Sequence, residues 1–226
     1  MLSLEDISQI YRAGEVETRA LDGVSLHVGA GTFVAVMGPS GCGKSSLLNI
    51  MGLLDKPAAG SCRFRGEEVA GASRARLAEL RRGAIGFVFQ TFNLIDDLNV
   101  AENVEVGLLY TGVSSGERRR RVAEVLDQVG MGHRAKHHPR QLSGGQQQRV
   151  AVARAIVARP ALILADEPTG NLDTANGQRV MDLLETCVTS GAALVMVTHS
   201  LAHAARAGRT VHLLDGRIVS ETQADR

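Results

Sequence analysis

The sequence predicts an α/β fold with a mostly parallel, buried sheet, an antiparallel N-terminal part and a largely helical insertion. Four short runs are almost wholly apolar, at residues 33–37, 85–89, 161–165 and 192–197, and runs of this length fit strands buried on both faces. Segments with helical periodicity lie between them. The N-terminal segments instead mix polar and apolar residues between glycine-containing turns.

The elements are expected in the following order. Residues 2–10, 19–28 and 60–69 are predicted to be antiparallel strands with one wet face. Helices are expected at 46–54, at 144–158 and after Ser114, where Ser114 and Glu117 predict a capping box and Gly130 a helix end. We expect one domain over residues 1–226, with the β-subdomain and core at 1–90 and 151–226, a helical subdomain at about 91–150, and a frayed tail after residue 220.

Composition limits the classes of protein to which the chain can belong. The formal net charge is +1 at pH 7, from 25 basic and 24 acidic side chains, which argues against nucleic-acid binding. Three widely spaced cysteines match no metal-ligand spacing and indicate reduced thiols in a cytosolic setting. We expect no secretory leader, and no apolar run reaches the about 18–20 residues of a membrane span. A role at a membrane would therefore require another chain.

A glycine-rich loop follows the first apolar run. Residues 38–45 read Gly-Pro-Ser-Gly-Cys-Gly-Lys-Ser and fit the phosphate-binding pattern GxxxxGK[ST] between a strand and a helix. Glycines let successive N–H groups face an anion, and the helix N-terminus adds its dipole. We expect Lys44 on the β- and γ-phosphates and the Ser45 hydroxyl on Mg²⁺. The residues expected to contact nucleotide are Gly38, Ser40, Gly41, Cys42, Gly43, Lys44, Ser45 and Ser46, although Cys42 is interpreted as a small residue that simply fits.

Two carboxylates, Asp166 and Glu167, end the third apolar run. In parallel α/β sheets, ligands bind at the carboxyl ends of the strands. We expect Asp166 to hold Mg²⁺, directly or through water, and Glu167 to orient and deprotonate the attacking water. Alone, such a pair could equally cap a strand; together with the phosphate-binding loop it favours nucleotide hydrolysis. No guanine-reading motif of the NKxD type is present, so ATP is favoured over GTP.

Residues 142–146 read Leu-Ser-Gly-Gly-Gln and lie shortly before the acidic pair. With the two other motifs, this segment resembles the ABC ATPases over nearly the whole chain. The resemblance implies a P-loop NTPase (RecA-like) core with an N-terminal antiparallel β-subdomain and an inserted α-helical subdomain. It further implies that Gln90 is the Q-loop glutamine, which acts in catalysis and on Mg²⁺, that His199 is the switch histidine on the γ-phosphate or water, and that Tyr11 stacks on adenine. Gln90 could instead be an ordinary strand-end residue, and Tyr11 could simply pack on the β-subdomain.

The resemblance also implies a head-to-tail homodimer that forms on ATP binding. The Ser143 hydroxyl and the following N–H groups form a second anion site at a helix N-terminus, and one chain offers no second phosphate to fill it. The family places this segment over the ATP of the other subunit, in a reciprocal, two-fold contact. The residues implied to contact nucleotide in trans are Ser143, Gly144, Gly145, Gln146 and the D-loop residue Asp173.

Three further segments, at residues 87–94, 101–104 and 166–173, look like the group that contains the macrolide-export, lipoprotein-release and cell-division ATPases. The resemblance implies a cytoplasmic protein at the cytoplasmic face of the inner membrane. An integral membrane partner would dock near Thr91, Phe92, Asn93 and Leu94, although Phe92 and Leu94 could equally pack the core of the insertion.

Several functions fit this resemblance. An energy-coupling ATPase of an exporter or mechanotransmission complex is expected first, then a cell-division or wall-remodelling ATPase, then an importer subunit. Soluble ABC proteins of translation or DNA repair are rejected, because the chain holds neither a second cassette nor a long coiled-coil insertion. The sequence does not separate the first two functions, and it does not reveal a transported substrate.

Overall fold

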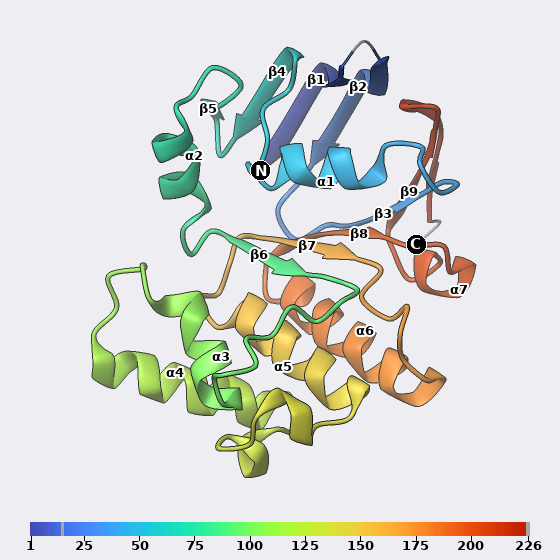
Figure 1. Ribbon diagram of the computed structural model, residues 1–226. Helices are drawn as coiled ribbons and strands as arrows, with labels where there is room; N and C mark the ends of the chain where they lie inside the picture. Colours follow the sequence, from blue (N-terminus) through green and yellow to red (C-terminus); the bar gives the residue numbers. More distant parts are fainter. Residues whose placement is uncertain (15, 225–226) are drawn as a thin grey trace. The chain divides into compact units, whose positions relative to one another are not determined.

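The computed structural model describes residues 1–14 and 16–224 (Figure 1). The chain forms two compact units. The first runs to Arg81 and resumes at Ala193, and the second is Arg82–Ala192. The helical subdomain predicted at about residues 91–150 remains a prediction, because the division into two units does not test it. In the described part of the chain, no helix combines the length and the apolar character needed to cross a membrane.

The first unit contains an antiparallel sheet in the strand order β2-β1-β4-β5. Its strands are β1 (Leu2–Ala13), β2 (Val16–Val28), β4 (Ala59–Phe64) and β5 (Glu67–Glu68). Leu2 lies opposite Val28 and Leu4 opposite Leu26, and all four side chains are buried, whereas His27 between them is exposed. This alternation confirms the prediction of antiparallel strands with one wet face.

The same unit contains a second group of strands in the order β10-β9-β3-β8. These are β3 (Phe33–Met37), β8 (Ala193–Val197), β9 (Arg209–Leu214) and β10 (Arg217–Gln223). β3 runs parallel to both β8 and β9, and β3 and β8 are buried along their whole length, as predicted. The helices of the unit are α1 (Lys44–Met51), α2 (Arg74–Arg81) and α7 (Leu201–Ala204).

The expectation of a frayed tail after residue 220 is wrong for the described residues. Strand β10 continues to Gln223 and pairs with β9 in antiparallel register, with Glu221 opposite Val211. The Arg209 guanidinium lies 2.7 Å from the Glu221 carboxylate. Hydrogen bonds to β9 therefore order this segment, although its polar composition alone predicts no regular structure.

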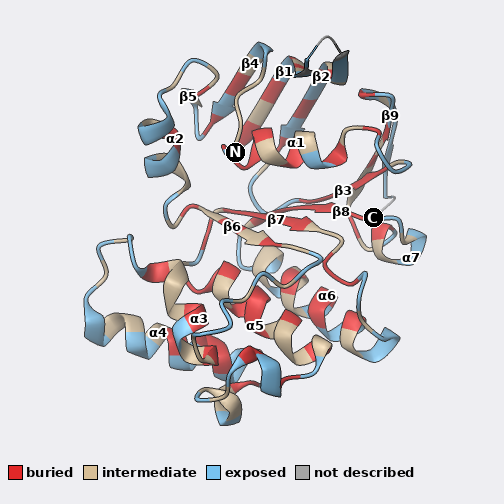
Figure 2. Ribbon diagram, viewed as in Figure 1, coloured by how far each residue is buried: buried red, intermediate tan, exposed pale blue. Residues whose placement is uncertain are grey.

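The second unit combines two parallel strands with helices. The strands are β6 (Ile85–Val88) and β7 (Leu162–Asp166), and the helices are α3 (Val100–Glu105), α4 (Ser115–Gln128), α5 (Gly144–Ile156) and α6 (Thr174–Thr189), with 3₁₀ turns at Val106–Leu108, Gly132–Arg134 and Pro139–Gln141. Helix α5 packs against β6, α3, α4 and α6, and buried residues follow β7 and much of α5 in Figure 2. Helix α5 is therefore the centre of this unit's core.

Strand β6 differs from the prediction that it is buried on both faces. Gly86 and Val88 are buried, but Ile85 and Phe87 are only half-buried. This apolar run is therefore a strand with alternating burial, and one of its faces remains accessible.

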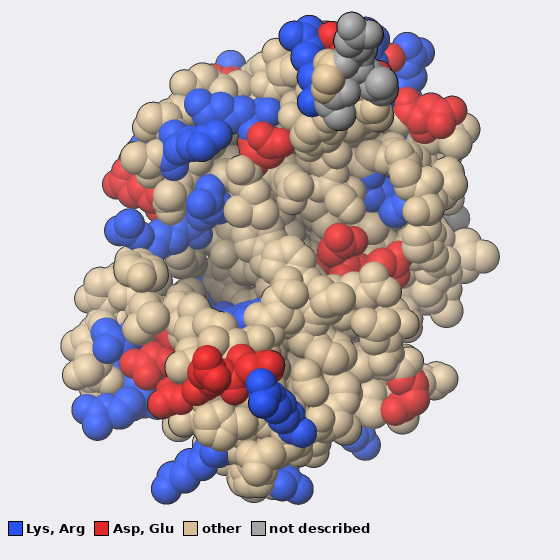
Figure 3. Space-filling view, viewed as in Figure 1, with Lys and Arg blue, Asp and Glu red and all other residues tan. Residues whose placement is uncertain are grey.

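The start of α4 also differs from the prediction. Ser114 Oγ accepts a hydrogen bond from the Glu117 N–H at 3.4 Å, but the Glu117 carboxylate binds Arg120 and Arg121 rather than closing a capping box. Hydrogen bonds from Arg120, and to a smaller extent from Arg121, lower the pKa of Glu117 to about 2. Acidic and basic side chains both occur over α3 and α4 in Figure 3. Gly130 ends the helix in a left-handed conformation, φ 66°, as predicted.

Candidate functional site

The phosphate-binding loop connects β3 to α1 in the first unit. A Cβ atom at Gly38 would lie 2.1 Å from the Leu213 oxygen, and one at Gly43 would lie 2.2 Å from the Ala20 oxygen. Gly43 also has φ 106°, in the left-handed region. Both contacts are with main-chain atoms that cannot rotate away, so only glycine fits at these two positions.

The Lys44 side chain lies within this loop. It is 8% exposed, and its Nζ donates hydrogen bonds to the main-chain oxygens of Gly38, at 2.8 Å, and Pro39, at 2.7 Å. Gly43 caps α1 without a side chain, so no capping side chain competes for the N–H groups of the first turn. Ser45, in that turn, is exposed. A positive charge and a helix N-terminus together make an anion-binding loop.

The structure places His199 at the same sheet edge as this loop. Strands β3 and β8 are parallel neighbours, with Val36 opposite Val197. The loop after β3 and the exposed His199 after β8 therefore both follow the carboxyl ends of adjacent strands.

Tyr11 lies on β1, away from the core. It is 41% exposed, and its hydroxyl donates to Asp55 Oδ2 at 3.3 Å. An exposed aromatic ring held by one polar contact offers a face for stacking.

The acidic pair and Gln90 lie together at one sheet edge of the second unit. Strands β6 and β7 are parallel, with Val88 opposite Ala165, so Gln90 and Asp166 both follow carboxyl ends. Glu167 has φ 44°, a left-handed conformation that is uncommon outside glycine. The side chain of Gln90 lies against Gly170, where an added Cβ would be 2.9 Å from Gln90 Nε2.

The segment 142–146 forms the start of α5. Ser143 Oγ accepts from the Gln146 N–H at 3.4 Å, and Gln146 Oε1 accepts from the Ser143 N–H at 2.9 Å, which completes a reciprocal capping box. Ser143 itself is exposed. Gly145 is buried against α6, where a Cβ would lie 2.5 Å from the Asn176 side chain. The helix N-terminus is thus fixed in position and accessible.

Asp173 is the N-cap of α6. Its carboxylate accepts from the Asn176 N–H at 2.8 Å and from Asn176 Nδ2 at 2.6 Å. These hydrogen bonds, the main-chain one first, lower the pKa of Asp173. The sequence signal of this cap is an aspartate followed by a helical pattern, which the resemblance to the D-loop does not by itself provide.

A groove lies beside the segment that follows Gln90. Of its lining residues, the sequence predicts only Asn93 as part of a docking surface. The groove has a volume of about 350 Å³, and Phe87, Phe89, Asn93, Val106 and Arg154 are among its lining residues. The rings of Phe87 and Phe89 stack at 5.7 Å. Phe92 and Leu94 are half-buried, and Thr91 and Asn93 are exposed. The spacing of Ile85, Phe87 and Phe89 on alternate positions was the available signal.

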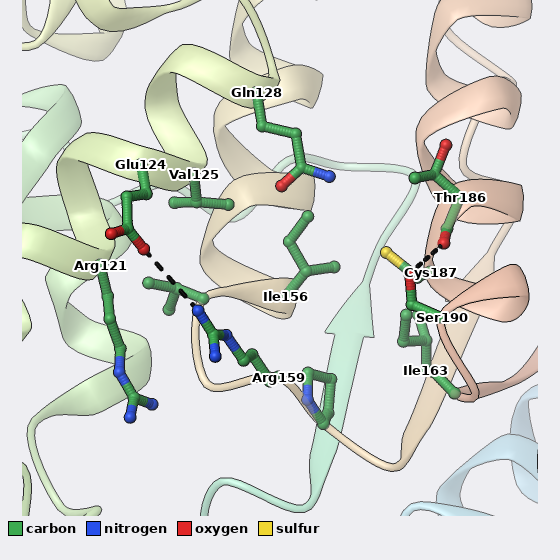
Figure 4. Close-up of a pocket in the computed structure, with 13 residues that line it drawn as sticks. Arg121, Glu124, Val125, Gln128, Ile156, Arg159, Ile163, Thr186, Cys187 and Ser190 are labelled. Atoms are coloured by element: carbon green, nitrogen blue, oxygen red, sulfur yellow. Dashed lines mark hydrogen bonds and ion pairs between the residues drawn. The ribbon is translucent and has the colours of Figure 1, made fainter.

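Another cavity of the second unit, about 300 Å³, lies between α4, the end of α5 and α6 (Figure 4). Ile156 and Val125 form apolar walls, and Arg159 pairs with Glu124 at 3.7 Å. Burial raises the pKa of the Cys187 thiol at this cavity to about 11. None of the predicted site residues lines it.

Comparison with known proteins decides the family. A family model described as ABC transporter matches residues 21–170. An ABC transporter ATP-binding protein of Thermotoga maritima, named as uncharacterized, is 49% identical over 218 residues, which cover 96% of this chain and 93% of that protein. The chain belongs to the ABC transporter family. It is an ATPase domain of that family, with the P-loop NTPase fold that the resemblance implied.

Other relatives of this ABC ATPase carry a more specific name. The macrolide export ATP-binding/permease protein MacB of Azoarcus sp. is 47% identical over 221 residues, or 98% of this chain. The chain spans 34% of that relative's length. The dimeric structure of the ATP-binding cassette MJ0796 in a post-hydrolysis state, with ADP and phosphate, matches with a TM-score of 0.93 and 42% identity over 100% of both chains. The predicted resemblance to the macrolide-export group is confirmed.

Proposed function

We propose that this ABC ATPase powers a separate integral membrane partner through a cycle of ATP-driven dimerisation and hydrolysis. The observation that carries the proposal is that two anion-binding helix N-termini are built into one chain. One lies at the glycine-rich loop with Lys44, and the other is the exposed, capped start of α5 at Ser143. One nucleotide phosphate group occupies the first, and the second has a use only when another subunit supplies its nucleotide.

The loop residues bind the phosphates of ATP. Lys44 contributes its charge on the β- and γ-phosphates, and the remaining expected contacts are main-chain N–H groups and hydroxyls of residues 38–46. Tyr11 stacks on adenine. Its 41% exposure supports this role over simple packing in the β-subdomain.

Glu167 and Gln90 of the second unit and His199 of the first supply the chemistry. Glu167 orients and deprotonates the attacking water, and Gln90 and His199 contact the γ-phosphate or that water. The left-handed backbone of Glu167, φ 44°, supports a functional role, because such strain is retained where a side chain must be aimed.

Magnesium suits the oxygen donors of this site. No group of three or more His, Cys, Asp or Glu side chains in the described parts of the chain is arranged to hold a metal. A hard cation that takes phosphate oxygens and water needs few protein ligands, and we assign these to Ser45, Gln90 and Asp166. When bound, Mg²⁺ would offset negative charge on the phosphates.

The signature segment acts in trans. In the proposed head-to-tail homodimer, Ser143, Gly144, Gly145 and Gln146 contact the γ-phosphate of the ATP that the other subunit holds. Asp173 lies in the same interface. The MJ0796 cassette, 42% identical over the whole chain, is dimeric with ADP and phosphate bound, which supports a dimer. Loss of the γ-phosphate contacts then favours opening.

The partner docks at the groove beside residues 91–94. Half-buried Phe92 and Leu94 do not complete an interior core, and the accessible rings of Phe87 and Phe89 extend the apolar surface. Aromatic side chains in a groove are typical anchors for a partner element. We propose that the protein acts at the cytoplasmic face of the inner membrane, where it would meet this partner.

Export or mechanotransmission is the favoured role, because several relatives are named macrolide export ATP-binding/permease proteins. A cell-division or wall-remodelling role is the alternative. The test is capture of the partner from detergent-solubilised membranes with the tagged chain, followed by identification by mass spectrometry. Thr91→Arg should abolish capture of the integral membrane protein, whereas Gln128→Arg, at the cavity of Figure 4, should not. Equal capture by both variants would contradict docking at residues 91–94.

A further inference from the structure

Gln148 is a buried amide on α5 that connects two other segments of the second unit. It is 1% exposed. Its Nε2 donates to the Phe89 oxygen at 3.2 Å and to the Pro168 oxygen at 2.7 Å. A side chain of the helix core therefore holds two peptide groups that are far apart in sequence.

The two acceptors determine the orientation of the amide. An NH₂ group has two hydrogens, one for each carbonyl, whereas the opposite orientation would place Oε1 against two other oxygens. In the adopted orientation, Oε1 is buried and has no hydrogen-bond partner among the described residues. An unsatisfied buried acceptor has a cost, which the two hydrogen bonds from Nε2 offset, so the amide both stabilises the fold and holds the two peptide groups in place.

The two peptide groups adjoin the residues assigned to hydrolysis. Phe89 directly precedes Gln90, and Pro168 directly follows Glu167. Asn171 Nδ2 reinforces the connection by donating to the Gln90 oxygen at 3.1 Å. Glu167 has a left-handed backbone, φ 44°, and such a conformation persists only where its surroundings fix it.

We propose that Gln148 is a positioning residue that fixes Gln90 and Glu167 relative to each other and to the helix that begins at Ser143. It touches no nucleotide in this account. The inference rests on the proposed roles of Gln90 and Glu167, and it adds the side chain that holds these two residues in position. Displacement of a reacting group by about 1 Å lowers turnover by roughly 100-fold, so a lost tether should be visible in kcat.

Gln148→Met tests this directly, because methionine keeps the length of the side chain and removes both donors. We expect kcat to fall by roughly 10- to 100-fold, with the Kd for ATP in the absence of Mg²⁺ unchanged, because the phosphate-binding loop belongs to the first unit. Gln178→Met is the matched control: Gln178 is exposed on α6 and bonds Asp182 at 3.2 Å. It should leave kcat unchanged. A Gln148→Met protein with reduced thermal stability but a normal kcat per folded molecule would overturn the proposal.

A double variant separates this inference from the function on which it rests. If Gln148 acts through Glu167, adding Gln148→Met to Glu167→Ala should lower the residual rate little further. A full multiplicative loss would contradict action through Glu167. Normal turnover of Glu167→Ala alone would instead remove the proposed base, whatever Gln148 does.

Gln148→Glu covers the case in which Gln148→Met does not fold. Burial and two facing carbonyl oxygens raise the pKa of the introduced carboxyl, and its neutral form regains one donor. Its kcat relative to that of the natural protein should therefore rise as the pH falls from about 8 to about 6. A ratio independent of pH, at the value of the natural protein, would contradict the tether.

Discussion

The Lys44 ammonium lies 2.8 Å from the main-chain oxygen of Gly38, at the opposite end of the same loop. The charge that we assign to phosphate binding therefore lies inside the loop, with 8% of the residue exposed. Lys44→Met should weaken ATP binding by roughly 10- to 150-fold, since a hydrogen bond to a charged group contributes about 1.5–3 kcal/mol. Titration calorimetry measures this. Lys56→Met, just beyond α1, is the control, and an equal loss in both variants would contradict the assignment.

Two of the three glycines of the loop, Gly41 and Gly43, should differ in their tolerance of alanine. Gly41 has φ 80° and no atom within 4 Å of an added Cβ, so Gly41→Ala should cost only the left-handed penalty of about 1–2 kcal/mol. Gly43→Ala adds a contact of 2.2 Å with the Ala20 oxygen and should lower the free energy of unfolding further. Urea denaturation compares them. Equal midpoints would show that the contact with Ala20 does not constrain the loop.

The in-trans role of the signature predicts complementation between two inactive variants. Lys44→Met and Ser143→Arg should each have little ATPase activity alone. Mixed, they form a head-to-tail pair with one intact site, built from the loop of one chain and the signature of the other. Turnover should therefore rise when the two proteins are titrated together. A mixture no more active than its components would indicate that the two motifs act within one chain.

Asp173→Asn should separate helix capping from the proposed interface role. In the folded protein, the pKa of Asp173 lies below its ordinary value of 3.8, chiefly because the Asn176 N–H donates a hydrogen bond to the carboxylate. This group therefore stabilises the fold at pH above its unfolded pKa, and the contribution disappears as the pH falls through the folded pKa. Asparagine is also a good N-cap, so the variant should lose only this acid-sensitive part, measured as unfolding midpoints between about pH 2.5 and 7. A difference from the natural protein that persists in acid would contradict this origin. Reduced turnover at unchanged neutral stability would support the interface role.

Local sequence patterns predicted the parts of the fold that depend on local physics. Strands β3 and β8 are fully apolar runs, β7 is apolar up to its last residue, Asp166, and the phosphate-binding loop is defined by its own spacing. Gly130 ends α4 because its conformation is a property of one residue.

Features that depend on distant partners could not be predicted in this way. The tail forms β10 only because β9 lies beside it. Helix α2 buries only Leu77, and its composition is strongly polar. The accessible face of β6 depends on what the neighbouring elements leave uncovered.

The residues of the candidate site also fall into those that a local pattern predicts and those that depend on distant partners. Motif residues such as Lys44, Asp166 and Ser143 are readable from short patterns. The amide of Gln148 is not, because its importance comes from two carbonyls, at Phe89 and Pro168, that only the fold brings to it. The resemblance named the D-loop, and the structure adds that Asp173 caps α6.

The most direct test of the account is the mass of the Glu167→Gln protein in solution, by light scattering, with and without ATP and Mg²⁺. Removing the base should slow hydrolysis by about 10²- to 10⁴-fold while leaving ATP binding intact. We expect a monomer without nucleotide, a dimer with ATP, and no dimer when Ser143→Arg is added. A protein that stays monomeric with saturating ATP, both alone and with its captured membrane partner, would contradict the composite site.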